Sequence, residues 1–274
     1  MHLLLLHLMA CSAEEEAAEP AAVTEAPAAP QKQLPKDLTS KSKNLASRDI
    51  LAPSPEETRK TVEKAGLTTA LGSLVPERSF TFEGISKDQV AIRTGVSLSD
   101  MILTIKERPK EQLLANIKAI NEGLKLMGAG EGLLGMLDHM HLRFNNDELS
   151  RQELLDELES IVSMSVPEHG FSKDDRTGPL LQAGSWVAGV NLVSQAILKE
   201  ERVDTAKTLL RLETVADYFL GYVDTEGSDK AGTEVLGTMK ASLLKLKEIA
   251  SKQDIQKSDV EAVVSETGKL LELI

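Results

Sequence analysis

Helical periodicity constrains this chain more than any other feature of its sequence. From about residue 48 to the C-terminus, apolar residues recur every three or four positions, the spacing that gives a helix one apolar face. Two segments, Ser54-Pro55-Glu56-Glu57 and Ser150-Arg151-Gln152-Glu153, place a serine three residues before a glutamate, as in a capping box at a helix start. The alternating stretch 79–83 is too isolated to indicate a sheet. The sequence therefore predicts an all-α fold.

The periodicity predicts a multi-helix bundle of about nine helices over residues 48–274. The expected helices are 54–74, 86–106, 109–127, 131–144, 150–164, 179–199, 202–221, 230–251 and 258–273. Gly128 falls just past the end of one predicted helix, where glycine commonly terminates helices. Ser258-Asp259-Val260-Glu261 predicts a third capping box at the start of the last helix.

Two sets of four helices resemble each other. Arg93-Thr94-Gly95-Val96-Ser97-Leu98 can be aligned with Gln182-Ala183-Gly184-Ser185-Trp186-Val187, and the capping box at Ser150 then corresponds to the one at Ser258. One interpretation is a duplication, with repeats at 86–165 and 176–274. The alternative is chance, because amphipathic helices align easily.

Small residues gather near the start of each proposed repeat. Gly95, Ser97 and Ser99 lie in the first, and Gly184 and Ser185 in the second. Glycine inside a helix costs about 1 kcal/mol relative to alanine. We expect close backbone approach to a neighbouring helix as the compensation.

The segment Pro179 to Leu198 has twenty residues without a charge, which is long enough to cross a bilayer. It also contains polar amides and hydroxyls, however, including those of Gln182, Asn191 and Ser194. This composition favours a central buried helix over a membrane span.

The chain opens with a short apolar stretch. Leu3 to Ala10 is apolar apart from His7 and is far shorter than the roughly 20 residues that span a bilayer. It reads as an export signal at residues 1–10. The following Leu8-Met9-Ala10-Cys11 resembles the lipobox of bacterial lipoproteins. That resemblance implies that Cys11 is lipidated, becomes the new N-terminus and holds the protein at a membrane.

Residues 11–47 have the composition of a disordered tether. They are rich in Ala, Pro and Glu and have almost no large apolar residues, so burial cannot offset the entropy of ordering. The simplest interpretation is a passive spacer. The acidic run Glu14-Glu15-Glu16 is also similar to the surface-export signals of Bacteroidetes lipoproteins.

The helical part shows a looser resemblance. Arg93-Thr94-Gly95-Val96-Ser97-Leu98-Ser99-Asp100, with the later Gly184-Ser185-Trp186, resembles uncharacterised all-helical exported proteins of Bacteroidetes. This resemblance implies an exported helical domain and assigns no functional residue.

Composition excludes several functions. Aromatic residues make up only 3%, which argues against stacking platforms for sugars or bases. The formal net charge of −12 opposes binding to nucleic acid, so no nucleic-acid partner is expected. A single cysteine excludes an internal disulfide and any site that needs several cysteines.

A search for catalytic and metal-binding motifs gives no candidate. No GxSxG, HExxH, phosphate-binding loop or EF-hand loop occurs. His139 and His141 are two positions apart, so on a helix they point about 200° apart and cannot share one metal. His169 lies in a polar loop. We therefore predict no enzymatic activity, no catalytic residue, no metal site and no cofactor.

One cluster of residues could form a small-ligand pocket between helices. Gln182, Asn191 and Gln195 would supply polar groups, and Trp186 and Tyr218 would supply the walls. The alternative is that these side chains satisfy one another inside the core.

These observations predict a lipid-anchored protein of the bacterial cell envelope, with the outer membrane as the expected location. Its helical domain would bind or scaffold without catalysis, and its partner would be another envelope protein or a small solute. Two alternatives remain: a periplasmic small-molecule-binding protein, and a cytoplasmic helical protein whose N-terminus only resembles a signal.

Overall fold

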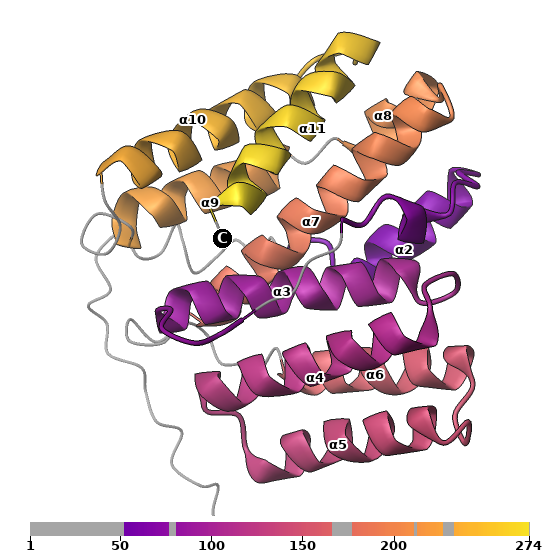
Figure 1. Cartoon of the computed structure of the whole chain (residues 1–274). Coiled ribbons are helices and arrows are strands. Elements are labelled where there is room, and N and C mark those ends of the chain that lie inside the picture. The colour runs from indigo at the N-terminus through magenta and orange to yellow at the C-terminus, as the bar shows by residue number, and fades with distance from the viewer. Residues whose placement is uncertain (1–51, 77–80, 166–176, 211–212, 227–232, 274) are drawn as a thin grey trace, which may run out of the picture. The chain divides into compact units, whose positions relative to one another are not determined.

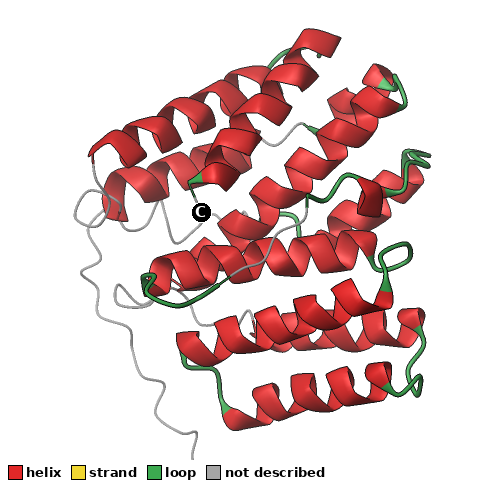
Figure 2. Ribbon diagram, in the orientation of Figure 1, coloured by secondary structure: helices red, strands yellow, loops and turns green. Residues whose placement is uncertain are grey.

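The computed structural model describes residues 52–76, 81–165, 177–210, 213–226 and 233–273. The chain divides into two units, Met1–Arg48 and Asp49–Ile274, and all described residues belong to the second. Every regular element of the described part is helical (Figure 2), which confirms the all-α prediction. The predicted signal peptide, the Cys11 lipidation site and the whole tether lie outside the described residues.

The described residues form ten α-helices and one 3-10 turn (Figure 1). The elements in chain order are α2 (Pro55–Lys64), η1 (Leu71–Ser73), α3 (Lys87–Thr104), α4 (Lys110–Met127), α5 (Glu131–Asn145), α6 (Arg151–Ser165), α7 (Thr177–Lys199), α8 (Val203–Leu209), α9 (Glu213–Glu226), α10 (Thr233–Ala250) and α11 (Lys257–Glu272).

Two of the three predicted capping boxes are confirmed. The Ser54 amide donates to Glu57 Oε2 at 2.8 Å, and the Glu57 amide donates to Ser54 Oγ at 3.1 Å. The same reciprocal pair joins Ser150 and Glu153. The prediction for the last helix was wrong, because α11 begins with Gln256 as its N-cap and the Gln256 amide donates to Asp259 at 2.9 Å. The carboxylate that bonds back to the N-cap backbone is therefore that of Asp259 and not that of the predicted Glu261.

Two predicted helices are shorter than expected. The helix expected over 54–74 ends at Lys64, because Gly66 adopts a left-handed φ of 74° and the Leu67 amide bonds back to the Val62 carbonyl. The chain then continues to the separate turn η1. The helix expected over 202–221 is two helices, α8 and α9. The second break accounts for the ten α-helices of the described residues, in agreement with the predicted bundle of about nine helices.

The apolar core has two clusters that meet where α3 and α7 pack together. One, the α3–α6 cluster, is built from buried side chains of those four helices together with Leu181 of α7. The other, the α7–α11 cluster, is built from α7 to α11, α2 and η1, together with Leu103 of α3. Each of the two central helices thus contributes to both clusters, and this sharing joins the halves of the described unit.

Glycines permit the close contact between α3 and α7. A Cβ atom added to Gly95 would overlap the carbonyl of Leu181, and one added to Gly184 would overlap the carbonyl of Ile92. The predicted close backbone approach is therefore confirmed at both positions. The contact is also reciprocal, because Gly95 and Ile92 lie 89 residues before Gly184 and Leu181.

α7 occupies the central position that its sequence predicts. All residues from Gly184 to Ser194 are buried, and the helix packs on α3, α11, α8, α2 and η1. No described helix is long and apolar enough to cross a bilayer. The segment between α2 and η1 is fixed to the end of α7 by Glu200, whose carboxylate accepts hydrogen bonds from the amides of Thr68 and Thr69.

The duplication stays a hypothesis. The reciprocal glycine contact relates α3 to α7 as the alignment predicts. The later helices pack differently, since α3 packs on the next helix, α4, whereas α7 packs more extensively on the last helix, α11, than on α8.

Candidate functional site

The residues predicted to form a ligand pocket lie on the central helix α7 and on α9. Asn191 and Gln195 come together one turn apart, and the Gln195 amide donates to Asn191 Oδ1 at 2.6 Å. The Asn191 amide donates to Thr267 Oγ1 at 2.8 Å and to the Val264 carbonyl at 3.2 Å. Thr267 Oγ1 in turn donates to the Val263 carbonyl at 2.7 Å. This relay of hydrogen bonds links α7 to α11.

The relay uses the polar groups that a ligand would need. Asn191 and Thr267 are both buried, so their hydrogen bonds replace contacts with water that folding removes. Sequence reasoning identified Asn191 and Gln195 but missed Thr267, because a threonine within an amphipathic helix gives no signal of its own. The geometry is the one expected if the amides satisfy one another inside the core.

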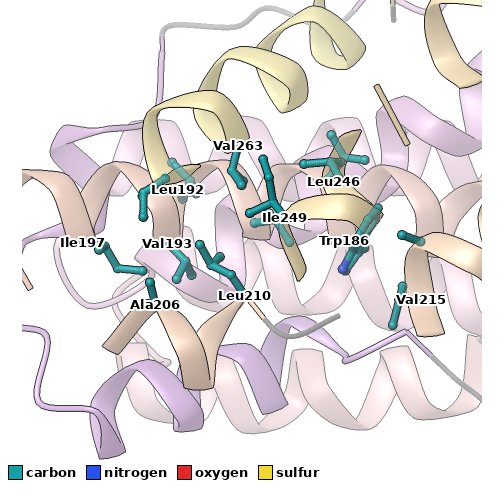
Figure 3. Close-up of a cluster of buried hydrophobic side chains, with 14 of the residues drawn as sticks. Trp186, Leu192, Val193, Ile197, Ala206, Leu210, Val215, Leu246, Ile249 and Val263 are labelled. Atoms are coloured by element: carbon teal, nitrogen blue, oxygen red, sulfur yellow. The ribbon is translucent and has the colours of Figure 1, made fainter. Parts of the chain in front are cut away.

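The two predicted aromatic walls both contact a third ring, which sequence reasoning did not include. Trp186 and Phe219 have ring centroids 5.3 Å apart, and Tyr218 packs edge-on against Phe219 at 5.2 Å. Burial raises the pKa of the Tyr218 hydroxyl. Figure 3 shows Trp186 among the buried aliphatic side chains of the α7–α11 cluster.

Some polar atoms near these rings have no partner. Trp186 Nε1 and Ser185 Oγ are buried and make no hydrogen bond within the described part of the chain. Gln182 is half-buried, and no hydrogen bond between described residues joins it to the other four predicted pocket residues. The five residues therefore separate into an amide relay, an aromatic group and an isolated glutamine.

A charged cluster that no sequence motif indicated joins α2 to α6 and to the turn after α3. Arg59 lies 2.9 Å from Glu63 and 3.5 Å from Glu159, and Lys106, in the turn just after α3, lies 2.6 Å from Glu63. Burial and the nearby Glu56 carboxylate raise the pKa of Glu159, while Arg59 opposes that shift. The Lys106 ammonium lowers the pKa of Glu63. These ion pairs link α2 to α6 and to the turn after α3.

The histidines on α5 stand apart, as the helical spacing predicts. His139 is exposed and His141 is half-buried. Burial lowers the pKa of His141, with Lys118 acting in the same direction and Asp138 against it. Among the described residues, no group of three or more His, Cys, Asp or Glu side chains could hold a metal ion. His169 lies outside the described residues.

A surface depression of about 540 Å³ lies where α4 and α6 begin and α5 ends. Its lining residues are Lys110, Phe144, Asp147, Glu148, Leu149, Ser150, Arg151 and Glu153. Lys110 Nζ contacts the Asn145 carbonyl at 2.9 Å and Asp147 at 2.5 Å, and Arg151 donates to the carbonyls of Ile105 and Arg108. These cationic groups are thus engaged in fixing helix ends.

Comparison with models of protein families, with curated proteins and with solved structures gave no match for this chain.

Proposed function

We propose that this chain is a lipid-anchored protein of the bacterial cell envelope, held in the outer membrane, whose helical domain binds or scaffolds another envelope component without catalysis. The observation that carries the proposal is the position of the single cysteine. Cys11 directly follows the apolar stretch Leu3–Ala10 and ends the lipobox-like Leu8-Met9-Ala10-Cys11.

Lipid attachment at that position would be enough to hold the protein at a membrane. One acyl chain anchors a protein only marginally, whereas two or more anchor it stably. The lipoprotein resemblance implies two or three chains on Cys11. The low-complexity stretch to residue 47 would then separate the membrane from the helices by up to roughly 100 Å when fully extended, at about 3 Å per residue.

The interior of the helical domain supports a binding or scaffolding role over a solute-carrying one. The amides of Asn191 and Gln195 bond to each other and to Thr267. A solute entering between α7 and α11 would have to break these buried hydrogen bonds before making its own. Recognition through the outer surfaces of the helices requires no such rearrangement.

The test is metabolic labelling of cells with a clickable palmitate analogue. We expect label on the wild-type chain and none on Cys11→Ala. The matched control is Ser12→Ala, which changes the adjacent residue and leaves the cysteine in place, so it should keep the label. An unlabelled wild-type chain recovered from the cytosol would overturn the proposal.

A further inference from the structure

α2 attaches to the bundle through little apolar surface. Of its ten residues only Pro55 and Val62 are buried, whereas α3, one of the helices it packs on, has thirteen buried residues among eighteen. Burial of apolar surface is the main source of stability in a folded protein. The attachment of α2 therefore depends more on polar contacts than that of α3 does.

The buried side of α2 adjoins polar atoms that have no partner. α2, α3 and α7 meet at Gly189, where an added Cβ atom would lie 3.8 Å from Thr58 of α2 and 3.4 Å from Ser99 Oγ of α3. Ser99 Oγ and Arg59 Nε are both buried, and neither has a hydrogen-bond partner within the described part of the chain. Such atoms cost free energy while α2 is in place, and departure of the helix would let water reach them.

The chain that follows α2 is fixed, and Gly66 separates the helix from it. Glu200 accepts hydrogen bonds from the amides of residues 68–69. Gly66 has a left-handed φ of 74° and open space at its Cβ position, so its backbone can change direction without a clash. Just before it, the Ala65 carbonyl accepts a long hydrogen bond, of 3.5 Å, from Arg202. α2 can therefore turn on Gly66 while the following segment stays in place.

Charged side chains supply further contacts of α2 with the bundle. At its C-terminal end, Glu63 lies 2.6 Å from Lys106 in the turn after α3. Near its middle, Arg59 lies 3.5 Å from Glu159 of α6. The charged groups of α2 that act on Glu159 are Glu56, Arg59 and Lys60. The link from α2 to α6 therefore depends on the charge of Glu159.

The proton on Glu159 determines whether this contact attracts or repels α2. Burial, and then the Glu56 carboxylate, raise the pKa of Glu159, while Arg59 and Lys60 oppose the shift. Glu159 also hydrogen-bonds to Glu56, whose pKa is lowered first by Lys60 and also by this bond. Protonated Glu159 donates to the Glu56 carboxylate and so joins α6 to α2. Ionised Glu159 places a second negative charge beside Glu56, and the two repel each other.

From the small apolar contact, the hinge at Gly66 and the pairing of Glu56 with Glu159, we propose that α2 is a releasable strap, fastened to α6 while Glu159 is protonated and released when that proton is lost. The strap is residues 52–66. Its fastening is strongest below the unfolded pKa of Glu159 and weakens as the pH rises through the higher folded pKa.

Release of the strap changes the reach of the helical domain, a consequence that rests on the proposed lipid anchor. The freed residues join the tether and add roughly 45 Å when extended, at about 3 Å per residue. The pH thus sets how far the bundle extends from the membrane.

Pulsed electron paramagnetic resonance between two spin labels tests the proposal on the full chain carrying Cys11→Ala, which removes the native cysteine. The labels are placed on Thr61→Cys of α2 and Ala115→Cys of α4, both exposed positions. We expect one narrow distance at pH 4. At pH 7 a second, longer and broader component should appear, with the ratio of released to fastened strap rising by about fivefold or more.

Two variants separate the role of Glu159 from a general effect of pH. Glu159→Gln keeps a donor for Glu56 and removes the charge, so it should retain the narrow distance at pH 7. The matched control is Glu157→Gln on the same helix, which should release the strap as the wild type does. Labels on Ala115→Cys and Leu244→Cys, neither of them on α2, should give one distance at both pH values if the bundle stays folded.

A single distance for the wild-type strap at both pH values would overturn the proposal. So would equal release in Glu159→Gln and Glu157→Gln at pH 7. The spin-label measurement needs no lipid, and palmitate labelling needs no release of α2. Failure of the strap and failure of the lipid anchor can therefore be told apart.

Discussion

The buried polar residues of α7 differ in whether they have partners, and this difference determines what each contributes to stability. Asn191 bonds to residues on both α7 and α11. Ser194, one turn away and fully buried, has no partner for its hydroxyl among the described residues. A buried polar group that has hydrogen-bond partners stabilises the fold modestly. Removing one of these groups leaves its former partners buried with neither a hydrogen bond nor water, which costs more. We therefore expect replacement of Asn191 and replacement of Ser194 to have different effects on stability.

Asn191→Ala should lower the free energy of unfolding by about 2–3 kcal/mol, because Gln195 and Thr267 lose their shared partner and a small cavity forms. Ser194→Ala is the control and should leave stability unchanged or raise it slightly, since it removes an unpaired hydroxyl. Urea titration followed by circular dichroism measures both. Equal losses of unfolding free energy in the two variants would contradict a stabilising role for the hydrogen bonds of Asn191.

Glu159 gives a prediction for pH dependence. Its pKa is raised in the folded protein, first by burial and then by Glu56. The folded state therefore holds the proton more tightly than the unfolded state, and the stabilisation from Glu159 is complete below its unfolded pKa and is lost as pH rises through its folded pKa. At neutral pH the ionised Glu159 therefore destabilises the folded state.

Glu159→Gln should therefore raise the melting temperature at pH 7 relative to the wild type, and the difference should shrink as the pH approaches 4. Glu157→Gln is the control on the same helix, where the carboxylate pairs with Arg143 at 2.6 Å. Thermal melts at several pH values compare the three proteins. A Glu159→Gln variant that is less stable than the wild type at neutral pH would show that the Arg59 contact dominates.

At the level of helices, glycines lie in three different surroundings in this chain. Gly66 ends α2 through its left-handed backbone, and Gly95 and Gly184 allow α3 and α7 to approach. Gly237 on α10 is exposed and has open space at its Cβ position. Only the surroundings of each glycine distinguish these uses, and a sequence shows them poorly.

Gly95→Ala should destabilise the fold by about 3 kcal/mol or prevent folding, because the methyl group would overlap the rigid backbone of α7. Gly237→Ala should raise stability by up to about 1 kcal/mol through helix propensity. Chemical denaturation of the purified variants gives both values. Loss of stability in Gly237→Ala, or none in Gly95→Ala, would contradict the packing described.

The starts of helices were more predictable than their ends. Ser54 and Ser150 act locally through a glutamate three residues later, so the sequence contains the whole motif. The end of α2 depends on one glycine, Gly66, inside a pattern that otherwise continues to 74.

The amide relay could be predicted only in part, because Thr267 lies 76 residues from Asn191 and periodicity does not indicate which helices meet. The contact between Arg59 and Glu159, which lie 100 residues apart, could not be predicted for the same reason.

At the scale of the whole described unit, the α3–α7 contact joins two apolar clusters. Leu181 of α7 belongs to the α3–α6 cluster, and Leu103 of α3 belongs to the α7–α11 cluster. Neither cluster keeps all of its members if these helices separate. We therefore expect the helical domain to unfold as one cooperative unit.

Two probes measure that cooperativity separately. Trp186 is the single tryptophan of the chain and lies in the α7–α11 cluster, so its fluorescence reports that cluster. Far-ultraviolet circular dichroism reports all helices together. Coincident transitions in denaturant are expected. A fluorescence transition displaced from the dichroism transition would show that the halves unfold independently.

The most direct test of the proposed function is the intact mass of the chain purified from bacterial membranes. We expect a polypeptide that begins at Cys11 and carries the added mass of two or three acyl chains on that residue. A polypeptide that retains residues 1–10 and carries no lipid would contradict the lipid anchor and, with it, the envelope location on which the proposal rests.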